Sequence, residues 1–110
     1  MKLYGLRNCD SSKKALMEIR NTGQDIEFID IRTNSPSLLT MQGWLNQHGD
    51  KVIVNRKSTT WRKLNDADRL APALKLLEAH PTLIKRPIIV VRDTIYVGWN
   101  AEVKSALGIT

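Results

Sequence analysis

The chain has 110 residues but only one cysteine, two histidines and no long hydrophobic run. A single cysteine cannot form an internal disulfide, which excludes the small secreted proteins that several disulfides hold together. A structural zinc site takes about four ligands, so one cysteine and two histidines are too few for it. The longest plain apolar run, residues 88–91, is far shorter than the roughly 20 residues that cross a membrane. We therefore expect no metal site and no membrane segment.

The start of the chain also lacks the apolar stretch of a signal peptide. Together with the single cysteine, this predicts a cytoplasmic location, where thiols stay reduced. The hydrophobic fraction of 42% and the charged fraction of 25% are those of an ordinary globular protein. We expect a single domain over residues 1–110, with a monomer as the default state.

Long runs of like charge are missing too, although 17 Lys and Arg against 11 Asp and Glu give a formal charge of +6. The cations are spread along the chain in pairs. No RNA-binding aromatic motif, phosphate-binding loop or paired-cysteine finger accompanies them. The charge therefore predicts small anionic ligands, or mere solubility, rather than nucleic acid as a partner.

The two ends of the chain predict an α/β fold. Alternating apolar residues indicate strands over residues 2–6 and 26–31, and the helix between them ends at Gly23. Such a β-α-β unit normally has parallel strands. Further on, residues 88–91 and 94–97 form a predicted hairpin, and a final helix follows it. The expected sheet is mixed and has four strands.

The middle of the chain predicts a helical insertion over about residues 35–80. Ser35 is expected to cap a helix that ends at Gly49. Residues 51–63 carry mixed polar and charged side chains and predict a loop with one helical turn. Apolar residues at helical spacing predict a further helix over about residues 70–79.

The lone cysteine, Cys9, lies where the first predicted strand passes into the first helix. A lone cysteine is most often a small buried hydrophobic residue. Here, however, Asn8 precedes it and polar residues follow it, which suits a core position poorly. The N–H groups at a helix N-terminus favour the thiolate over the thiol, and Lys13 adds positive charge in the first turn. Cys9 is therefore a candidate reactive thiol.

The dipeptide Arg86-Pro87 directly precedes the buried strand at residues 88–91. On its own it is an ordinary strand start, because most bonds before proline are trans. In a chain of this element order, with a thiol at the first strand-helix junction, Pro87 falls where a thioredoxin fold has its cis-proline. That proline presents backbone to the substrate of the thiol.

Three segments carry a resemblance to a known family: residues 8–15 around Cys9, residues 55–64, and residues 80–88 ending in Arg86-Pro87-Ile88. In this order they resemble the ArsC/Spx family of arsenate reductases and their relatives. The middle segment is most similar to the branch called YffB-type. The resemblance covers essentially the whole chain and implies a thioredoxin-like core with a helical insertion.

The resemblance also implies roles for particular residues. Arsenate reductases surround a cysteine nucleophile with three arginines that hold the oxyanion. Cys9 matches the nucleophile, and Arg56 and Arg86 match the first two arginines. The third should fall within residues 95–100, where this sequence has no arginine. The departure puts arsenate in doubt and leaves a basic site with two arginines.

These matches predict a thiol site that binds an anionic substrate, and a reductase activity. Arginine suits carboxylates and oxyanions because its guanidinium is flat, bidentate and always charged. Glutathione is the natural co-substrate, with glutaredoxin as a further partner and no bound cofactor. Ser12 is expected to donate a hydrogen bond to the thiolate, Lys13 to add charge and Pro87 to align the co-substrate.

An alternative from the same family is a non-catalytic adaptor that binds RNA polymerase, as the Spx regulators do. The redox-sensing members of that group carry a second cysteine three residues after the first. This chain has Ser12 there, so a disulfide switch is impossible. A monothiol can still form a mixed disulfide with glutathione, which a second thiol resolves.

Overall fold

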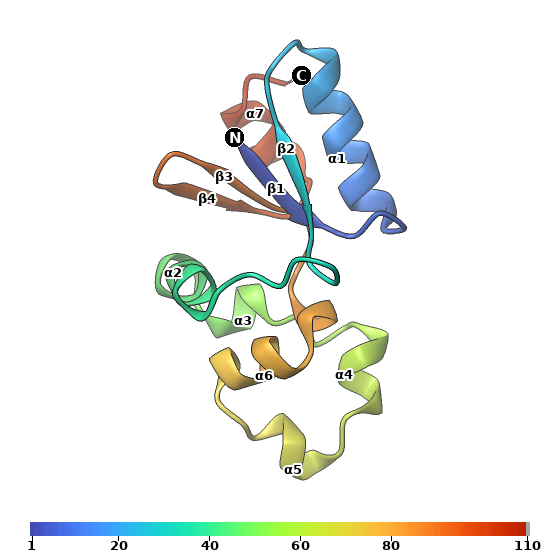
Figure 1. The fold of residues 1–110 in the computed structure, drawn as a ribbon, viewed down its shortest axis with the longest axis vertical. Coiled ribbons are helices and arrows are strands. Elements are labelled where there is room, and N and C mark those ends of the chain that lie inside the picture. Colours follow the sequence, from blue (N-terminus) through green and yellow to red (C-terminus); the bar gives the residue numbers. More distant parts are fainter. Residues whose placement is uncertain (110) are drawn as a thin grey trace. The chain divides into compact units, whose positions relative to one another are not determined.

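The computed structural model describes residues 1–109 and divides into two compact units (Figure 1). The first unit joins residues 1–30 to the segment that begins at Arg86, and the second is Ile31–Lys85. The insertion predicted over about residues 35–80 lies within the second unit. That the two units form a single domain stays a prediction.

The first unit is built on a four-stranded sheet in the order β2-β1-β3-β4. The strands are β1 (Lys2–Gly5), β2 (Glu27–Asp30), β3 (Ile88–Val91) and β4 (Thr94–Val97). β1 pairs with β2 in parallel and with β3 antiparallel, and β3 pairs antiparallel with β4. The predicted mixed sheet and thioredoxin-like α/β class are confirmed.

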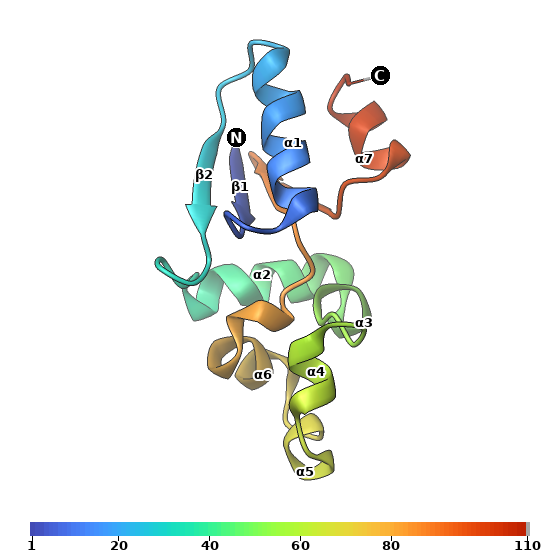
Figure 2. The same cartoon turned by 90° about the vertical axis from the view of Figure 1, so that its right-hand side faces the viewer.

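Helices α1 (Asp10–Asn21) and α7 (Ala101–Ala106) lie on the same side of this sheet (Figure 2). The residues on that face form one hydrophobic cluster because strand side chains alternate and helix side chains recur every three or four positions. Its buried members are Leu3, Ala15, Ile19, Ile89, Val103 and Ile109. The cluster holds α1 against β1, and so fixes the junction that carries Cys9.

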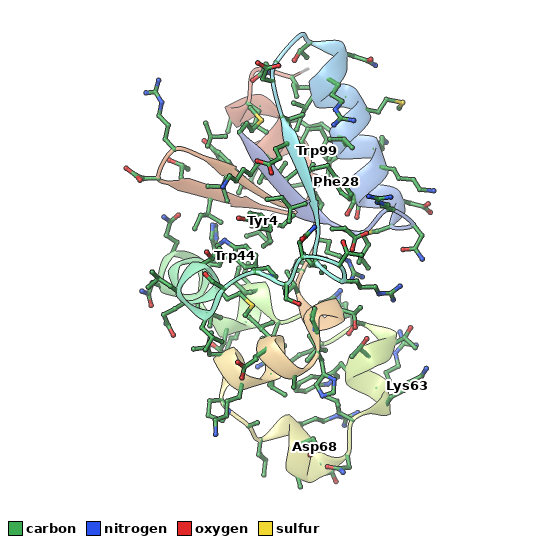
Figure 3. All side chains as sticks on the ribbon, viewed as in Figure 1. Tyr4, Phe28, Trp44, Lys63, Asp68 and Trp99 are labelled. Atoms are coloured by element: carbon green, nitrogen blue, oxygen red, sulfur yellow. The ribbon has the colours of Figure 1, made fainter. Side chains whose placement is uncertain are left out.

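A polar contact also ties α1 to the segment around α7. The Trp99 indole N–H donates to the Glu18 carboxylate over 2.5 Å, and the Lys104 ammonium lies 3.6 Å from the same oxygen. Lys104 also lies 5.6 Å from the centre of the Trp99 ring. Trp99 is seen beside the sheet of the first unit in Figure 3. Asn100 caps α7, since its side chain accepts from the Val103 N–H over 2.9 Å.

The second unit consists of short helices. They are α2 (Leu38–His48), α3 (Asp50–Ile53), α4 (Thr59–Lys63), α5 (Asp66–Arg69), α6 (Ala73–Ala79) and the 3-10 turn η1 (Pro81–Leu83). Its buried side chains include Met41, Trp44, Ile53, Leu77 and Leu83. None of the helices within residues 1–109 has the length and apolar character needed to span a bilayer.

Two expectations for the second unit were wrong at helix starts. The cap of α2 is Ser37 rather than Ser35, and its hydroxyl accepts from the Thr40 N–H over 3.1 Å. Ser35 and Ser37 both flank Pro36. Ser37 is the cap because it lies three residues before Thr40, whose N–H has no partner within the helix. The predicted end of α2 at Gly49 is confirmed, with φ of 83°.

The predicted helix over residues 70–79 is also shorter than expected. Leu70 is 86% exposed, and α6 begins only after Pro72, which cannot donate a backbone hydrogen bond. The residues just before it form α5, a separate turn capped by Asn65. The interval 51–63 contains two helical turns, α3 and α4, rather than the one that was expected.

Candidate active site

The junction between β1 and α1 places Cys9 at the N-cap of the helix. The Cys9 N–H donates to the Leu6 carbonyl over 3.1 Å, which closes the turn after β1. The Lys13 N–H donates to the Cys9 carbonyl over 3.0 Å and begins the helix. The side chain is half-buried, and the backbone N–H of Ser12 in the first turn favours its thiolate.

Ser12 holds this junction together. Its side chain is completely buried, and its hydroxyl oxygen accepts from the Leu6 N–H over 3.4 Å. Gly5 leaves the space that Ser12 occupies, because a Cβ atom at Gly5 would lie only 2.4 Å from the serine oxygen. Since the Leu6 N–H is directed at a lone pair of that oxygen, the serine hydroxyl proton stays available to the Cys9 sulfur.

The hydroxyl oxygen of Ser11 lies 3.3 Å from the Cys9 sulfur. Partial burial raises the pKa of the Cys9 thiol. Four groups that favour the thiolate together lower this pKa by more than burial raises it. In order of effect they are the hydroxyls of Ser11 and Ser12, the backbone N–H of Ser12 and the charge of Arg86. The resulting pKa is about 7, so roughly half of the cysteine is thiolate at neutral pH.

The sheet brings Arg86 and Pro87 to the same end as Cys9. Tyr4 near the end of β1 pairs with Ile88 at the start of β3, so the chain leaving β1 runs beside the chain entering β3. The Arg86–Pro87 peptide bond is cis, as the thioredoxin-like fold implies. Pro87 is buried, and its carbonyl accepts from the Gly98 N–H over 2.8 Å. The predicted alignment of a co-substrate by Pro87 stays a prediction.

Lys13 is exposed on the first turn of α1. The groups that lower the pKa of the Cys9 thiol do not include its ammonium. Its side chain instead lines a shallow groove on the surface of α1 together with Leu16, Met17, Arg20 and Asn21. The role that the structure gives Lys13 is thus an exposed positive charge within one helical turn of the thiol.

Arg56 belongs to the second unit, in the loop between α3 and α4. It is exposed, its guanidinium nitrogen lies 3.5 Å from an oxygen of Asp50, and its carbon Cζ lies 5.4 Å from the centre of the Trp61 ring. These contacts hold the guanidinium on the surface of its own unit. Its predicted role in anion binding stays a prediction.

Five of the six predicted site residues, all except Arg56, lie in the first unit. Ser11 was not among the predicted site residues, although its hydroxyl oxygen lies 3.3 Å from the sulfur. The available signal was its place two residues after an N-cap, where a hydroxyl can turn back toward the cap side chain. Within residues 1–109 no three His, Cys, Asp or Glu side chains come together to hold a metal ion.

The arrangement in the first unit suits nucleophilic attack by sulfur. A thiolate is both the nucleophile and the better partner for helix N–H groups, and a nearby guanidinium attracts anions to it. A protein family model described as the ArsC family matches residues 4–107. The chain belongs to the ArsC family. The predicted membership in the ArsC/Spx family is therefore confirmed.

Two individual relatives match nearly the whole chain. An uncharacterized protein of Haemophilus influenzae is 38% identical over 105 residues, which cover 91% of each chain. The regulator Spx 2 of Bacillus anthracis is 27% identical, over 91% of this chain and 80% of its own length.

Two solved structures of the same type are also similar. A protein titled YFFB has a TM-score of 0.90 at 29% identity and covers 96% of both chains. An arsenate reductase related protein from Brucella melitensis has a TM-score of 0.75 at 30% identity, over 96% of this chain and 91% of that one. These similarities connect the chain to both groups of the family, the reductases and the regulators.

Proposed function

We propose that this ArsC-family protein is a thiol-dependent reductase with Cys9 as a monothiol nucleophile and glutathione as its co-substrate. The observation that carries the proposal is the Cys9 sulfur at the N-cap of α1, beside the Ser11 hydroxyl and with a thiol pKa of about 7. Family membership and the similarity to an arsenate reductase related protein support the same class of activity.

The reaction begins with attack of the Cys9 thiolate on one sulfur of a disulfide. A new bond forms between Cys9 and that sulfur, the old sulfur-sulfur bond breaks, and the second sulfur leaves as a thiolate that takes a proton from water. A glutathione thiolate then attacks the mixed disulfide at Cys9. When the adduct is a glutathionyl group taken from a mixed disulfide, the products are oxidised glutathione and the free Cys9 thiolate, so one reduced glutathione is consumed in each turnover.

The charged groups have separate tasks in this scheme. Arg86 favours the Cys9 thiolate electrostatically, which raises the concentration of the nucleophile. Arg56 and Lys13 would attract the carboxylates of glutathione, which carries two. Ser12 would donate to the leaving or attacking sulfur from its buried position, and Pro87 would shape the site. No third arginine is found in residues 95–100, so disulfides fit this set better than arsenate does.

The direct test is to incubate the protein with oxidised glutathione near pH 7 and to record the intact mass. We expect a single glutathionyl adduct at Cys9, and its release when reduced glutathione is added. The Cys9→Ser variant should acquire no adduct. If the unmodified protein also stays free of adduct near neutral pH, the proposed function is wrong.

The alternative proposal is a non-catalytic adaptor that binds RNA polymerase. The observation that favours it is the similarity to Spx 2 over 91% of this chain. Immobilised protein should then retain polymerase subunits at physiological salt, and Cys9→Ser should retain them equally well, because Ser12 leaves no disulfide switch. Turnover of glutathione disulfides without polymerase retention favours the reductase instead.

The reductase proposal includes a cytoplasmic setting, in which reduced glutathione is plentiful, and a monomer as the active form. A glutaredoxin could replace the second glutathione, because its thiol also attacks mixed disulfides. Size-exclusion chromatography coupled to light scattering checks the oligomeric state. Addition of a glutaredoxin to the stalled glutathionyl adduct checks the second partner.

A further inference from the structure

The exposed surface of α1 continues directly from the thiol. Residues that lie four, seven and eleven positions apart on a helix share one face. Counted from Cys9, these positions are Lys13, Leu16 and Arg20. From Cys9 to Arg20 this stripe runs about 16 Å along the helix axis, at a rise of about 1.5 Å per residue.

This stripe is hollowed into a groove with a volume of about 370 Å³. Its lining residues, all on α1, are Lys13, Leu16, Met17, Arg20 and Asn21. Met17 is 59% exposed and so offers an apolar contact on this surface. Methionine also adapts its shape to different partners.

The charge of the groove has one sign. Its lining contains a lysine near the thiol end and an arginine near the far end, both exposed, and no acidic residue. Glu18 on the same helix is already bonded to Trp99 and Lys104. Asp10, at the first position of α1, is the acidic side chain near the thiol and opposes this charge in part. The complement of such a surface is an acidic segment with an apolar side chain.

Resting on the reductase activity proposed above, we infer that the groove on α1 binds an acidic polypeptide segment next to the disulfide that Cys9 attacks. The substrate class is thus a protein mixed disulfide with glutathione, flanked by Asp or Glu residues. An extended segment of about five residues spans the 16 Å stripe, at about 3.3 Å per residue. An apolar side chain of that segment packs on Met17, and its carboxylates meet Lys13 and Arg20.

The chemistry is that of the proposed reductase with the polypeptide as leaving group. The Cys9 thiolate attacks the glutathione sulfur of the mixed disulfide, the bond to the substrate cysteine breaks, and the substrate leaves as a thiolate that takes a proton from water. One reduced glutathione then removes the glutathionyl group from Cys9 as oxidised glutathione. The groove changes only how fast the first step occurs.

The test compares three substrates of one enzyme: oxidised glutathione, a glutathionylated peptide with Glu on both sides of its cysteine, and the same peptide with Gln in place of Glu. We expect the acidic peptide to react about tenfold faster than the neutral one at low salt, as two favourable surface charge pairs allow. The preference should shrink as salt is added.

Two substitutions away from the thiol test the groove itself. Arg20→Glu should abolish the preference for the acidic peptide, and Met17→Gln should slow both peptides by about threefold through lost apolar contact. Both variants should react with oxidised glutathione at the unaltered rate. Arg92→Glu, on the exposed hairpin turn, changes the net charge equally and is the matched control that should keep the preference.

The outcomes separate this inference from the function on which it rests. Equal rates for the two peptides, with normal reaction of oxidised glutathione, overturn the groove assignment and leave the reductase in place. Loss of the preference in Arg92→Glu as strongly as in Arg20→Glu also overturns it, because the effect would then come from net charge alone. No reaction with any of the three substrates overturns both proposals.

Discussion

Each unit of this protein has buried apolar side chains, but one segment of the second unit is stabilised by polar contacts instead. In the first unit, strands and helices share one buried hydrophobic cluster. In the second unit, α4 and α5 have no buried residue at all. They are held by serine and asparagine caps at Ser58 and Asn65 and by the Arg69 side chain, which donates to the Trp61 carbonyl over 3.0 Å.

Trp61 is the centre of this polar arrangement. The guanidinium carbons of Arg56 and Arg69 lie 5.4 and 5.3 Å from the centre of its ring. Lys63 and Asp68 extend from the same helices into solvent (Figure 3). Each such contact is worth about 1 kcal/mol or less, whereas a buried aliphatic side chain contributes about 2 to 3 kcal/mol. The α4–α5 segment should therefore open more easily than the sheet.

The largest expected effect comes from truncating one buried residue in each unit. Ile89→Ala in the first unit and Leu77→Ala in the second should each lower the free energy of unfolding by about 3 kcal/mol. Hydrogen exchange of the β1 amides measures protection in the first unit, and exchange of the α6 amides measures protection in the second. If the chain is a single domain, either substitution lowers protection in both units by the same amount. Loss of protection only in the substituted unit would contradict that prediction.

A smaller effect should follow from Arg69→Ala. The substitution removes the hydrogen bonds to the Trp61 and Arg62 carbonyls and one cation-π contact. We expect about 1.5 kcal/mol less protection against hydrogen exchange in α4, with β1 unchanged. Arg92→Ala on the hairpin turn is the control. An equal loss of protection in β1 would show that α4 and α5 are as firmly coupled to the core as the sheet is.

The smallest effect concerns the polar end of the first unit. Ser11→Ala should raise the pKa of the Cys9 thiol, because a hydrogen bond that favours the thiolate is lost. Since less thiolate is then present, alkylation by iodoacetamide should slow about threefold at pH 7 and stay unchanged near pH 10. Ser105→Ala, an exposed serine on α7, is the control. Equal alkylation rates at pH 7 for Ser11→Ala and the unmodified protein would show that Ser11 does not favour the Cys9 thiolate.

The same contrast explains which elements could be predicted from the sequence. The strands and helices of the first unit were expected within about two residues of their observed ends. Their apolar residues recur at the period of two or of about 3.6, because one face of each element is buried. The starts of α2 and α6 were misplaced. The seven residues of α6 are too few to show a clear period, and Pro72 decides where it begins. At α2 two serines flank a proline, and either could serve as the cap.

The candidate site divides in a similar way. Cys9 and Ser12 stood out because they lie in one polar segment between a strand and a helix. Ser11 did not, since the sequence cannot show that its hydroxyl also turns toward the sulfur. That depends on Gly5, whose missing side chain leaves room for Ser12 against β1. With Ser12 held there, the Ser11 hydroxyl lies beside the thiol.

The sequence alone determined that any thiol chemistry here uses one cysteine, because Ser12 replaces a second cysteine and no other is present. It also determined that no arginine follows the second hairpin strand. Arg86 is far from Cys9 in the sequence. Only the tertiary structure decided that its charge lowers the pKa of the Cys9 thiol. The physical reason is the antiparallel pairing of β1 with β3, which joins the end of one to the start of the other.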